Sequence, residues 1–318
     1  MTSPPQRFTS YLLHISYYIR LGRPLFLTGG FLFHGLGIAI ALYQGEGLNL
    51  GAWLWGQVGI TAVQLMTHYS NDYFDLTADK ANQTPTRWSG GSRILVEGLV
   101  SPKAALVTAV MMGIVALTAA FILTFLIQSG PLTIPLYLLA LTLAWSYSSP
   151  PLQLNMRGRG ELTGAVLIPG LTTLVGYYLQ VEQPSNGPLS LLPFLAIFPL
   201  SCLQMAMLLV INFPDAQGDA AAGKRTLVHV LGEKTAVRLY LTLLTLTYLS
   251  LPILIVFGLP TAAALALLAL SPIAAWQGWR MARRAWADPA QWNSLGLWSI
   301  GLLILSATFE LLAFLYLL

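Results

Sequence analysis

Nine apolar stretches, each about 20 residues long, follow one another along this chain of 318 residues. One helix of about 20 apolar residues is long enough to cross the hydrocarbon core of a bilayer. Only 9% of the residues are charged, whereas soluble domains carry about 25%. The sequence therefore predicts an all-α polytopic membrane protein with nine transmembrane helices, in one domain covering residues 1–318. The predicted spans are 24–43, 52–74, 103–127, 131–149, 160–181, 190–213, 235–257, 260–281 and 293–318.

Positive charges divide the predicted loops into two groups. All sixteen Lys and Arg residues fall at the N-terminus, in the even-numbered loops, or at the helix ends beside them. The odd-numbered loops carry only Glu46 and Glu182 as charged residues. Since cytoplasmic loops are enriched in Lys and Arg, we expect the N-terminus and the even loops in the cytoplasm and the C-terminus on the opposite side. An eight-span arrangement would mix the charges, so the pattern favours nine spans.

Three carboxylates stand where the second span ends, in the stretch Asn71–Asp79. If the helix continues through this stretch, Asp72, Asp75 and Asp79 lie on one face at i, i+3 and i+7. Three unpaired anions on one face repel each other, and a divalent cation removes that repulsion. Mg²⁺ is the hard, oxygen-seeking candidate. Taken alone, a solvated acidic turn explains this stretch equally well.

A second copy of the pattern closes the sixth span. Asn212-x-x-Asp215-x-x-x-Asp219 matches Asp72-x-x-Asp75-x-x-x-Asp79 in spacing. Both copies end even-numbered spans, so they face each other on the predicted cytoplasmic side. Mg²⁺ typically bridges a few carboxylates to phosphate oxygens of a substrate. Two facing clusters therefore predict a site for two Mg²⁺ ions, with Asp72, Asp75, Asp79, Asp215 and Asp219 as metal ligands.

Basic residues follow both acidic motifs and favour an anionic ligand. Arg pairs with phosphate through two parallel hydrogen bonds, and Lys acts as a point charge. The expected ligands of the anion are Lys224, Arg225, Arg87, Arg93 and Arg157. Four other arginines, Arg238, Arg280, Arg283 and Arg284, are interpreted as markers of topology. The basic residues are scattered over short loops, which argues against nucleic acid as a partner.

Polar residues continue inward from the first motif along the second span. Gln64 and His68 recur at helical spacing with the motif, so they must face a bundle interior or a wet cavity. His68 alone is more often a satisfied packing residue than a catalyst. Tyr147 stands where the fourth span enters a basic loop, unlike the other tyrosines, which read as interfacial anchors.

These residues resemble the UbiA superfamily of intramembrane aromatic prenyltransferases. The family pattern N-D-x-x-D-x-x-x-D is present at Asn71–Asp79, and its second aspartate motif resembles Asp215-x-x-x-Asp219. Two softer segments are similar to the 1,4-dihydroxy-2-naphthoate branch, namely Gly90-Gly91-Ser92-Arg93 and the run from Tyr147 to Glu161. The chain departs from the usual pattern at Pro214, which should bend the helix end before Asp215.

The resemblance implies transfer of a polyprenyl group from an isoprenyl diphosphate to an aromatic acceptor, in menaquinone or related naphthoquinone biosynthesis. The favoured acceptor is 1,4-dihydroxy-2-naphthoate, which would lose its carboxylate. It implies that cytoplasmic loops at about 75–102, 150–160 and 214–234 cap the active site, and that the bilayer surrounds the helices. The implied catalytic residues are Asp75, Asp79, Asp215, Lys224 and Arg225. The implied substrate contacts are Asn71, Arg87, Arg93, Tyr147, Arg157 and Asn212, with Gln64 and His68 near the acceptor.

Two alternatives stay open at this point. The same chemistry could serve another acceptor, such as 4-hydroxybenzoate, homogentisate or a protohaem. A cation-coupled transporter or channel could also place acidic residues in a membrane, but no ionisable residue continues the motifs to the other side. Glu310 in the last span is too isolated to form a relay. The sequence gives no sign of an obligate protein partner.

Overall fold

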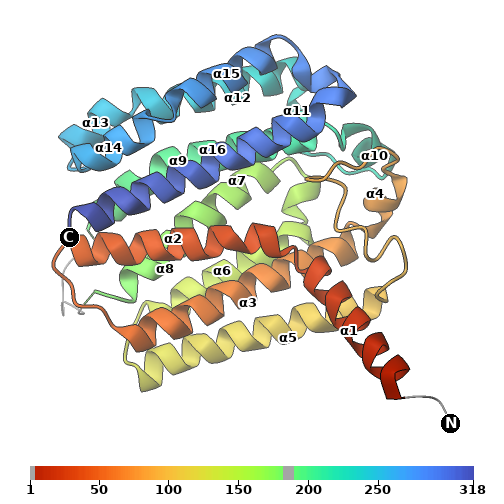
Figure 1. Cartoon of the computed structure of the whole chain (residues 1–318), viewed down its shortest axis with the longest axis horizontal. Helices are drawn as coiled ribbons and strands as arrows, with labels where there is room; N and C mark the ends of the chain where they lie inside the picture. Colours follow the sequence, from red (N-terminus) through yellow and green to blue (C-terminus); the bar gives the residue numbers. More distant parts are fainter. Residues whose placement is uncertain (1–3, 182–189) are drawn as a thin grey trace.

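The computed structural model describes residues 4–181 and 190–318, and every regular element in these ranges is a helix (Figure 1). The all-α prediction is confirmed. The α-helices are α1 (Pro4–Leu21), α2 (Pro24–Tyr43), α3 (Leu50–Phe74), α4 (Leu76–Ala81), α5 (Pro102–Phe121), α6 (Thr133–Ser148), α7 (Gly160–Ala165), α8 (Thr172–Tyr178), α9 (Leu192–Asn212), α10 (Ala216–Ala221), α11 (Leu227–Leu231), α12 (Glu233–Leu249), α13 (Leu251–Val256), α14 (Thr261–Leu268), α15 (Ser271–Ala282) and α16 (Pro289–Tyr316). Two π-helical segments, Ile122–Leu126 and Val166–Leu171, and two 3-10 turns, Leu154–Met156 and Ala285–Ala287, complete the list.

Five helices of the described chain are long and apolar enough to cross a membrane, and a sixth is added if α14 and α15, bent by 41°, count as one span. The expected count of nine is not confirmed by this criterion. The other three predicted spans do not meet this criterion of length and apolarity, each for a different physical reason. Helix α3 carries polar residues along its length, α6 has only 16 residues, and the span at 160–181 is divided into α7, a π-helical segment containing Pro169, and α8. A proline inside a helix removes a backbone hydrogen bond and disturbs the regular turn.

Helix starts are set by local sequence signals. Pro24, Pro102 and Pro289 occupy the first turns of α2, α5 and α16, where a missing N–H costs nothing. Side chains cap two of these helices: the Ser101 oxygen accepts from Ala104 N at 3.2 Å, and Asp288 accepts from Ala290 N at 3.0 Å. Such caps satisfy backbone donors that the helix itself leaves unpaired.

Glycines let helices α2 and α8 approach each other closely. Helix α2 packs against α8, and a Cβ atom added to Gly37 would lie 2.0 Å from the carbonyl oxygen of Thr173. A Cβ on Gly176 would lie 2.3 Å from the carbonyl oxygen of His34. Small residues at helix crossings are the usual means of packing membrane helices, because lipid supplies no hydrophobic drive between them.

We expect Gly37→Ala to destabilise the fold, because the obstructing atom belongs to backbone that cannot move aside. Overpacking of this kind costs about 1–3 kcal/mol or more. Thermal unfolding in detergent should show a clearly lower midpoint than wild type. Gly47→Ala is the matched control, since a Cβ there meets nothing within 4 Å. Equal midpoints for the two variants would contradict the packing argument.

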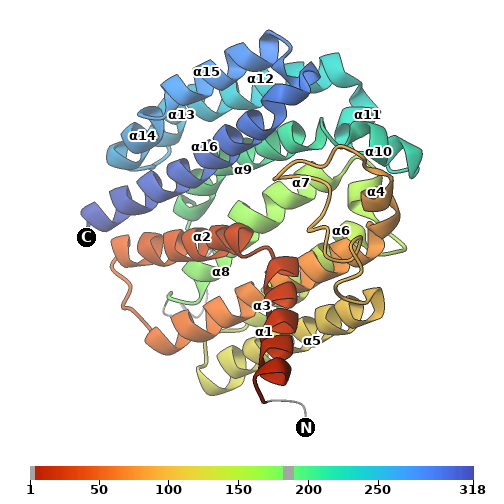
Figure 2. The same ribbon diagram turned by 45° about the vertical axis from the view of Figure 1, so that its right-hand side comes forward.

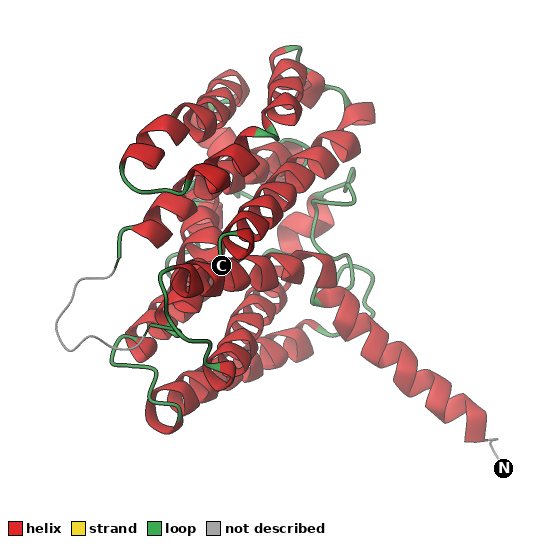
Figure 3. Ribbon diagram, turned by 60° about the vertical axis from the view of Figure 1, so that its left-hand side comes forward, coloured by secondary structure: helices red, strands yellow, loops and turns green. Residues whose placement is uncertain are grey.

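Both acidic motifs lie at one end of the bundle, which we call the motif end. Helices α4 and α10, which follow the two motifs, pack against each other there (Figures 1 and 2). The loop 82–101 between α4 and α5 crosses this end of the bundle (Figure 2). Helix α1 projects away from the bundle (Figure 3). The fold therefore brings together the motif segments, which are more than a hundred residues apart in sequence.

Candidate active site

The first motif spans the junction between α3 and α4. Asp75 lies between the two helices, although Asp75 N still donates to Asn71 O at 2.8 Å and Asp79 N to Asp75 O at 2.9 Å. The helical turn thus continues through the break, and it buries all three carboxylates. The three carboxylates lie close enough for Asp72 and Asp75 to act on Asp79, but their hydrogen-bond partners differ.

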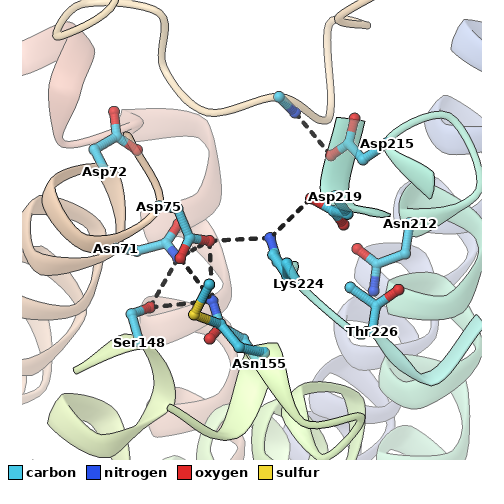
Figure 4. Close-up of polar contacts among 12 residues, drawn as sticks. Asn71, Asp72, Asp75, Ser148, Asn155, Asn212, Asp215, Asp219, Lys224 and Thr226 are labelled. Carbon is cyan, nitrogen blue, oxygen red and sulfur yellow. Dashed lines mark hydrogen bonds and ion pairs between the residues drawn. The ribbon is translucent and has the colours of Figure 1, made fainter. Parts of the chain in front are cut away.

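Asp72 has different polar partners from the other two carboxylates. Its side chain forms an ion pair with Arg23, which precedes α2, and accepts hydrogen bonds from the backbone and hydroxyl of Ser92. Figure 4 shows Asp72 apart from the cluster around Asp75. In this arrangement Asp72 ties the start of α2 to the loop 82–101. Its predicted role as a metal ligand remains a proposal.

Asp75 is the hub of a polar cluster (Figure 4). It accepts from Asn71 Nδ2 at 3.0 Å, from Asn155 Nδ2 at 2.9 Å and from Lys224 Nζ at 3.0 Å. The same Lys224 Nζ lies 3.4 Å from Asp219 Oδ1. One ammonium group therefore connects the first acidic motif to the second.

The second motif is held partly by the loop 82–101. Asp215 accepts from Asn82 Nδ2 at 2.8 Å through Oδ1 and from Gly90 N at 2.9 Å through Oδ2. Asp219 is buried, and its Oδ2 has no hydrogen-bond partner among the described residues. The loop also closes over Asp79, since a Cβ on Gly91 would lie 2.1 Å from Asp79 Oδ2.

Burial dominates the titration of these carboxyl groups. It raises the pKa of Asp79 to about 7, with further contributions from Asp72 and Asp75, and that of Asp219 to about 6. Burial also raises the pKa of Asp215. Burial alone would lower the pKa of the Lys224 ammonium. The neighbouring charges of Asp75 and Asp219 more than compensate, so its pKa is raised. The site thus holds a permanent cation beside carboxylates that take up protons near neutral pH.

Without metal, we expect the stability of the protein to fall as pH rises from about 4 to 7. A carboxyl group whose pKa is raised on folding binds a proton more tightly in the native state, so its charging at higher pH opposes folding. Thermal unfolding in detergent with a chelator, recorded from about pH 4 to about pH 8, measures this slope. The slope should flatten in Asp79→Asn, which cannot titrate. A slope as steep in the variant as in wild type would contradict the assignment to Asp79.

A cavity of about 530 Å³ opens beneath the motifs. Its motif end is lined by Asp75, Asp79, Asp215 and Lys224, and its deeper wall is mostly apolar. Of the residues singled out from the sequence, these also line it: Gln64, His68, Asn71, Tyr147 and Asn212. The cavity therefore combines a charged end with a long apolar body, which suits an amphiphilic ligand.

Four predicted anion ligands lie outside this cavity. Arg87 is exposed and stacks over Trp88 at 5.2 Å, and exposed Arg157 donates to the carbonyl oxygen of Pro151 at 2.9 Å. Arg225 is also exposed, and Arg93 donates to the backbone oxygen of Asp79. In this arrangement Arg93 supports the first motif, whereas the other three side chains do not contact the acidic cluster.

Several cavity residues were missed as site residues from the sequence. Arg23 and Asn155 line the cavity and contact the first motif. Glu161 accepts from Asn212 Nδ2 at 2.7 Å and from Leu227 N at 3.2 Å, which links α7 to the segments flanking the second motif. Gln204 is 1% exposed, lines the cavity, and has no partner for Nε2 among the described residues. The sequence did carry a signal for two of these residues: Arg23 and Glu161 are charged residues at the very start of apolar spans.

The donors at the motif end fit Mg²⁺ only in combination with a ligand. Within the described ranges, no three carboxylate, histidine or cysteine side chains converge on one point. Lys224 lies between the carboxylates instead, and Asp219 Oδ2 is a buried oxygen that no described residue partners. Mg²⁺ commonly uses one or two carboxylates and completes its shell with water and phosphate oxygens. The oxygen-only donor set agrees with that mode and not with a closed protein cage.

The fold and the cavity define an integral membrane protein with a pocket between helices that is charged at one end and apolar at the other. The sequence model of the UbiA prenyltransferase family matches residues 31–315. The chain therefore belongs to the UbiA prenyltransferase family.

Two curated relatives carry the same name, 1,4-dihydroxy-2-naphthoate octaprenyltransferase. The protein of Bacillus subtilis (strain 168) is 25% identical over 240 residues, which is 75% of this chain and 73% of that protein. The protein of Escherichia coli (strain K12) is 28% identical over 238 residues, 70% of this chain and 71% of that protein. A solved UbiA homolog from Archaeoglobus fulgidus, bound to GPP and Mg²⁺, has a TM-score of 0.59 at 16% identity, covering 95% of this chain and 99% of that chain. This structural likeness establishes the shared fold.

Proposed function

We propose that this prenyltransferase transfers a polyprenyl group from an isoprenyl diphosphate to 1,4-dihydroxy-2-naphthoate, with loss of the ring carboxylate. The observation that carries the proposal is Lys224, whose Nζ lies between Asp75 and Asp219 at the charged end of a largely apolar cavity. A diphosphate head fits the charged end and a prenyl tail fits the apolar body. The naphthoate acceptor is supported by the names of both curated relatives.

The carboxylates of the two motifs would hold the diphosphate head through Mg²⁺. The candidate ligands are Asp75, Asp79, Asp215 and Asp219, with Asp72 available if its ion pair with Arg23 opens. Bound Mg²⁺ would supply charge neutralisation on the diphosphate oxygens. The solved homolog, which is bound to GPP and Mg²⁺, supports a ligand that combines a prenyl diphosphate with Mg²⁺.

This chain's own residues then govern the transfer. The carbon–oxygen bond of the allylic diphosphate breaks, and Lys224 neutralises the charge that develops on the departing diphosphate. The apolar wall excludes water, which would otherwise trap the allylic cation. The electron-rich ring forms the new carbon–carbon bond, and departure of its carboxylate as carbon dioxide returns the electron pair to the ring.

Gln204 and Gln64 are our candidates for contacts with the acceptor. Gln204 Nε2 and Gln64 Oε1 are buried without hydrogen-bond partners in the described part of the chain. Both side chains line the cavity, Gln64 from α3 and Gln204 from α9. A buried unpaired polar atom costs about 1–3 kcal/mol, which a hydroxyl-bearing ligand would recover.

We expect Gln204→Leu to raise the acceptor KM about tenfold without changing the KM for the prenyl diphosphate. With an acceptor analogue that lacks one hydroxyl, the KM values of variant and wild type should differ less. An acceptor KM unchanged by Gln204→Leu would contradict the proposed contact.

We further propose that the motif end faces the cytoplasm, as the distribution of Lys and Arg predicts. The segments 75–102, 150–160 and 214–234 would then form the cytoplasmic cap of the active site. The C-terminus would lie on the opposite side of the membrane. Labelling of single cysteines introduced at Gly47 and Lys103 in intact cells tests this orientation.

The acceptor is tested with purified protein, labelled prenyl diphosphate, Mg²⁺ and a panel of aromatic acids. We expect lipid-soluble product and release of carbon dioxide with 1,4-dihydroxy-2-naphthoate. If product forms only with 4-hydroxybenzoate or homogentisate, that compound is the acceptor and the proposed naphthoate acceptor is wrong. Absence of transfer to any acceptor would overturn the proposed activity.

A further inference from the structure

Three arginines at the motif end of α15 each stack on a tryptophan. The pairs are Arg280 over Trp276 at 4.7 Å, Arg283 over Trp279 at 5.5 Å and Arg284 over Trp286 at 5.7 Å. We call these six residues the Arg–Trp patch. None of them lines the cavity. The patch is therefore a feature separate from the candidate active site.

Arg280 is the unusual member of the Arg–Trp patch, because it is only 7% exposed yet has no anionic partner among the described residues. The ion pairs of the described residues join Arg23 or Lys224 to acidic-motif aspartates, and none involves α15. Arg280 Nη1 donates to Gln277 Oε1 at 2.8 Å, which uses one of five guanidinium donors. A buried charge without a counter-ion is costly. Topology alone requires a positive charge at this end, but not a buried one.

The arginine is held in place by a buried network. Gln277 Nε2 donates to Leu295 O at 3.1 Å and to Ser299 Oγ at 3.0 Å, so α16 fixes the amide that accepts from Arg280. The carboxylate of Asp288, which follows the patch in sequence, is occupied as the cap of α16, where it accepts from Ala290 N and Gln291 Nε2. A fixed guanidinium loses little conformational freedom when it binds an anion.

The surroundings of Arg280 match the headgroup level of a bilayer. Trp276 is 40% exposed and Trp279 is 56% exposed, and tryptophan concentrates where acyl chains meet headgroups. Exposed Lys234 and Arg238 on α12, which packs against α15, add positive charge at the same end, and exposed Glu233 offsets one of the two. Guanidinium groups bind phosphate through parallel hydrogen bonds.

We infer that the Arg–Trp patch binds the phosphate headgroup of an anionic membrane phospholipid. Arg280 supplies the fixed donors, and exposed Arg283, directly after the end of α15, supplies a second guanidinium. The exposed Trp276 and Trp279 contact the glycerol and acyl region. The occupant is a lipid because the exposed tryptophans would be poorly matched to a free anion in water.

The test compares wild type with Arg280→Gln/Arg283→Gln in nanodiscs of phosphatidylcholine, with or without phosphatidylglycerol. We expect phosphatidylglycerol to raise the unfolding midpoint of wild type by about 2–4 °C, and the double variant to lose most of that rise. Lys103→Gln/Arg159→Gln removes the same charge from exposed positions elsewhere at the motif end and should keep the rise. If the first variant does not fold, Arg283→Gln alone should lose part of the rise.

Three outcomes overturn the inference. A full rise in the Arg280/Arg283 variant shows that the lipid acts elsewhere. An equal loss in the control variant shows that only total surface charge matters. A rise of the same size with inorganic phosphate in pure phosphatidylcholine shows that the ligand is a free anion. Because unfolding is measured, the proposed enzymatic activity does not enter the result.

Discussion

Asp75→Asn is expected to lower the rate of Mg²⁺-dependent prenyl transfer by about 10²- to 10³-fold, the loss typical of removing one well-placed charge from a transition-state site. Asparagine keeps the shape of the side chain and can still accept from Asn71 and Asn155. It removes the negative charge that Lys224 contacts at 3.0 Å and that a metal ion would require. The measurement is the initial rate at saturating Mg²⁺ with labelled prenyl diphosphate.

The control for Asp75→Asn is Asp288→Asn, the same chemical change at the cap of α16, away from the cavity. Both variants should elute as single species in detergent with wild-type helix content. The control should retain nearly full activity. Asp75→Asn with more than about a tenth of the wild-type rate would contradict the central role that we give this carboxylate.

Lys224→Met is expected to lower both the turnover rate and the Mg²⁺ concentration that the protein requires. The turnover rate should fall by about 10²-fold, because the charge on the leaving diphosphate loses its neutralising ammonium. The Mg²⁺ concentration needed for half-maximal rate should also fall, because Asp75 and Asp219 no longer share a competing cation. Titration of Mg²⁺ at saturating substrates measures both quantities.

Lys224→Arg separates charge from shape in this experiment. Arginine keeps the positive charge, so the Mg²⁺ requirement should stay close to that of wild type, while its larger planar head should still cost activity. A methionine variant that needs more Mg²⁺ than wild type would contradict competition between the ammonium and the metal. An unchanged turnover rate would contradict the contact with the leaving group.

The pairing of the two motifs could be predicted from their equal spacing and their places at the ends of even-numbered spans. The structure brings Asp75 and Asp219 to the same ammonium group. The partner of Asp72 could not be predicted, because Arg23 is 49 residues away and a helix pattern says nothing about which neighbouring helix supplies a counter-charge. The same limit explains why Arg157 and Arg225 were expected at the anion although both are exposed.

Breaks inside the helices were also beyond the sequence pattern. The π-helical segment Val166–Leu171 lies inside a continuous apolar run, where hydropathy is uniform and only Pro169 hints at a disturbance. The loop 82–101 has no periodic pattern, so its contacts with Asp215 through Asn82 and Gly90 follow from tertiary packing alone. Sequence therefore located the carboxylates, whereas the structure identified the amide and backbone groups that hold them.

The position of Lys224 bears on how such a protein matures. A newly inserted chain must bury several aspartates before any metal or diphosphate reaches it, and unpaired buried anions would resist that step. The ammonium supplies an internal counter-charge at 3.0 Å and 3.4 Å from the two motifs. Membrane insertion and helix assembly can thus finish first, and metal loading can wait for the arrival of substrate.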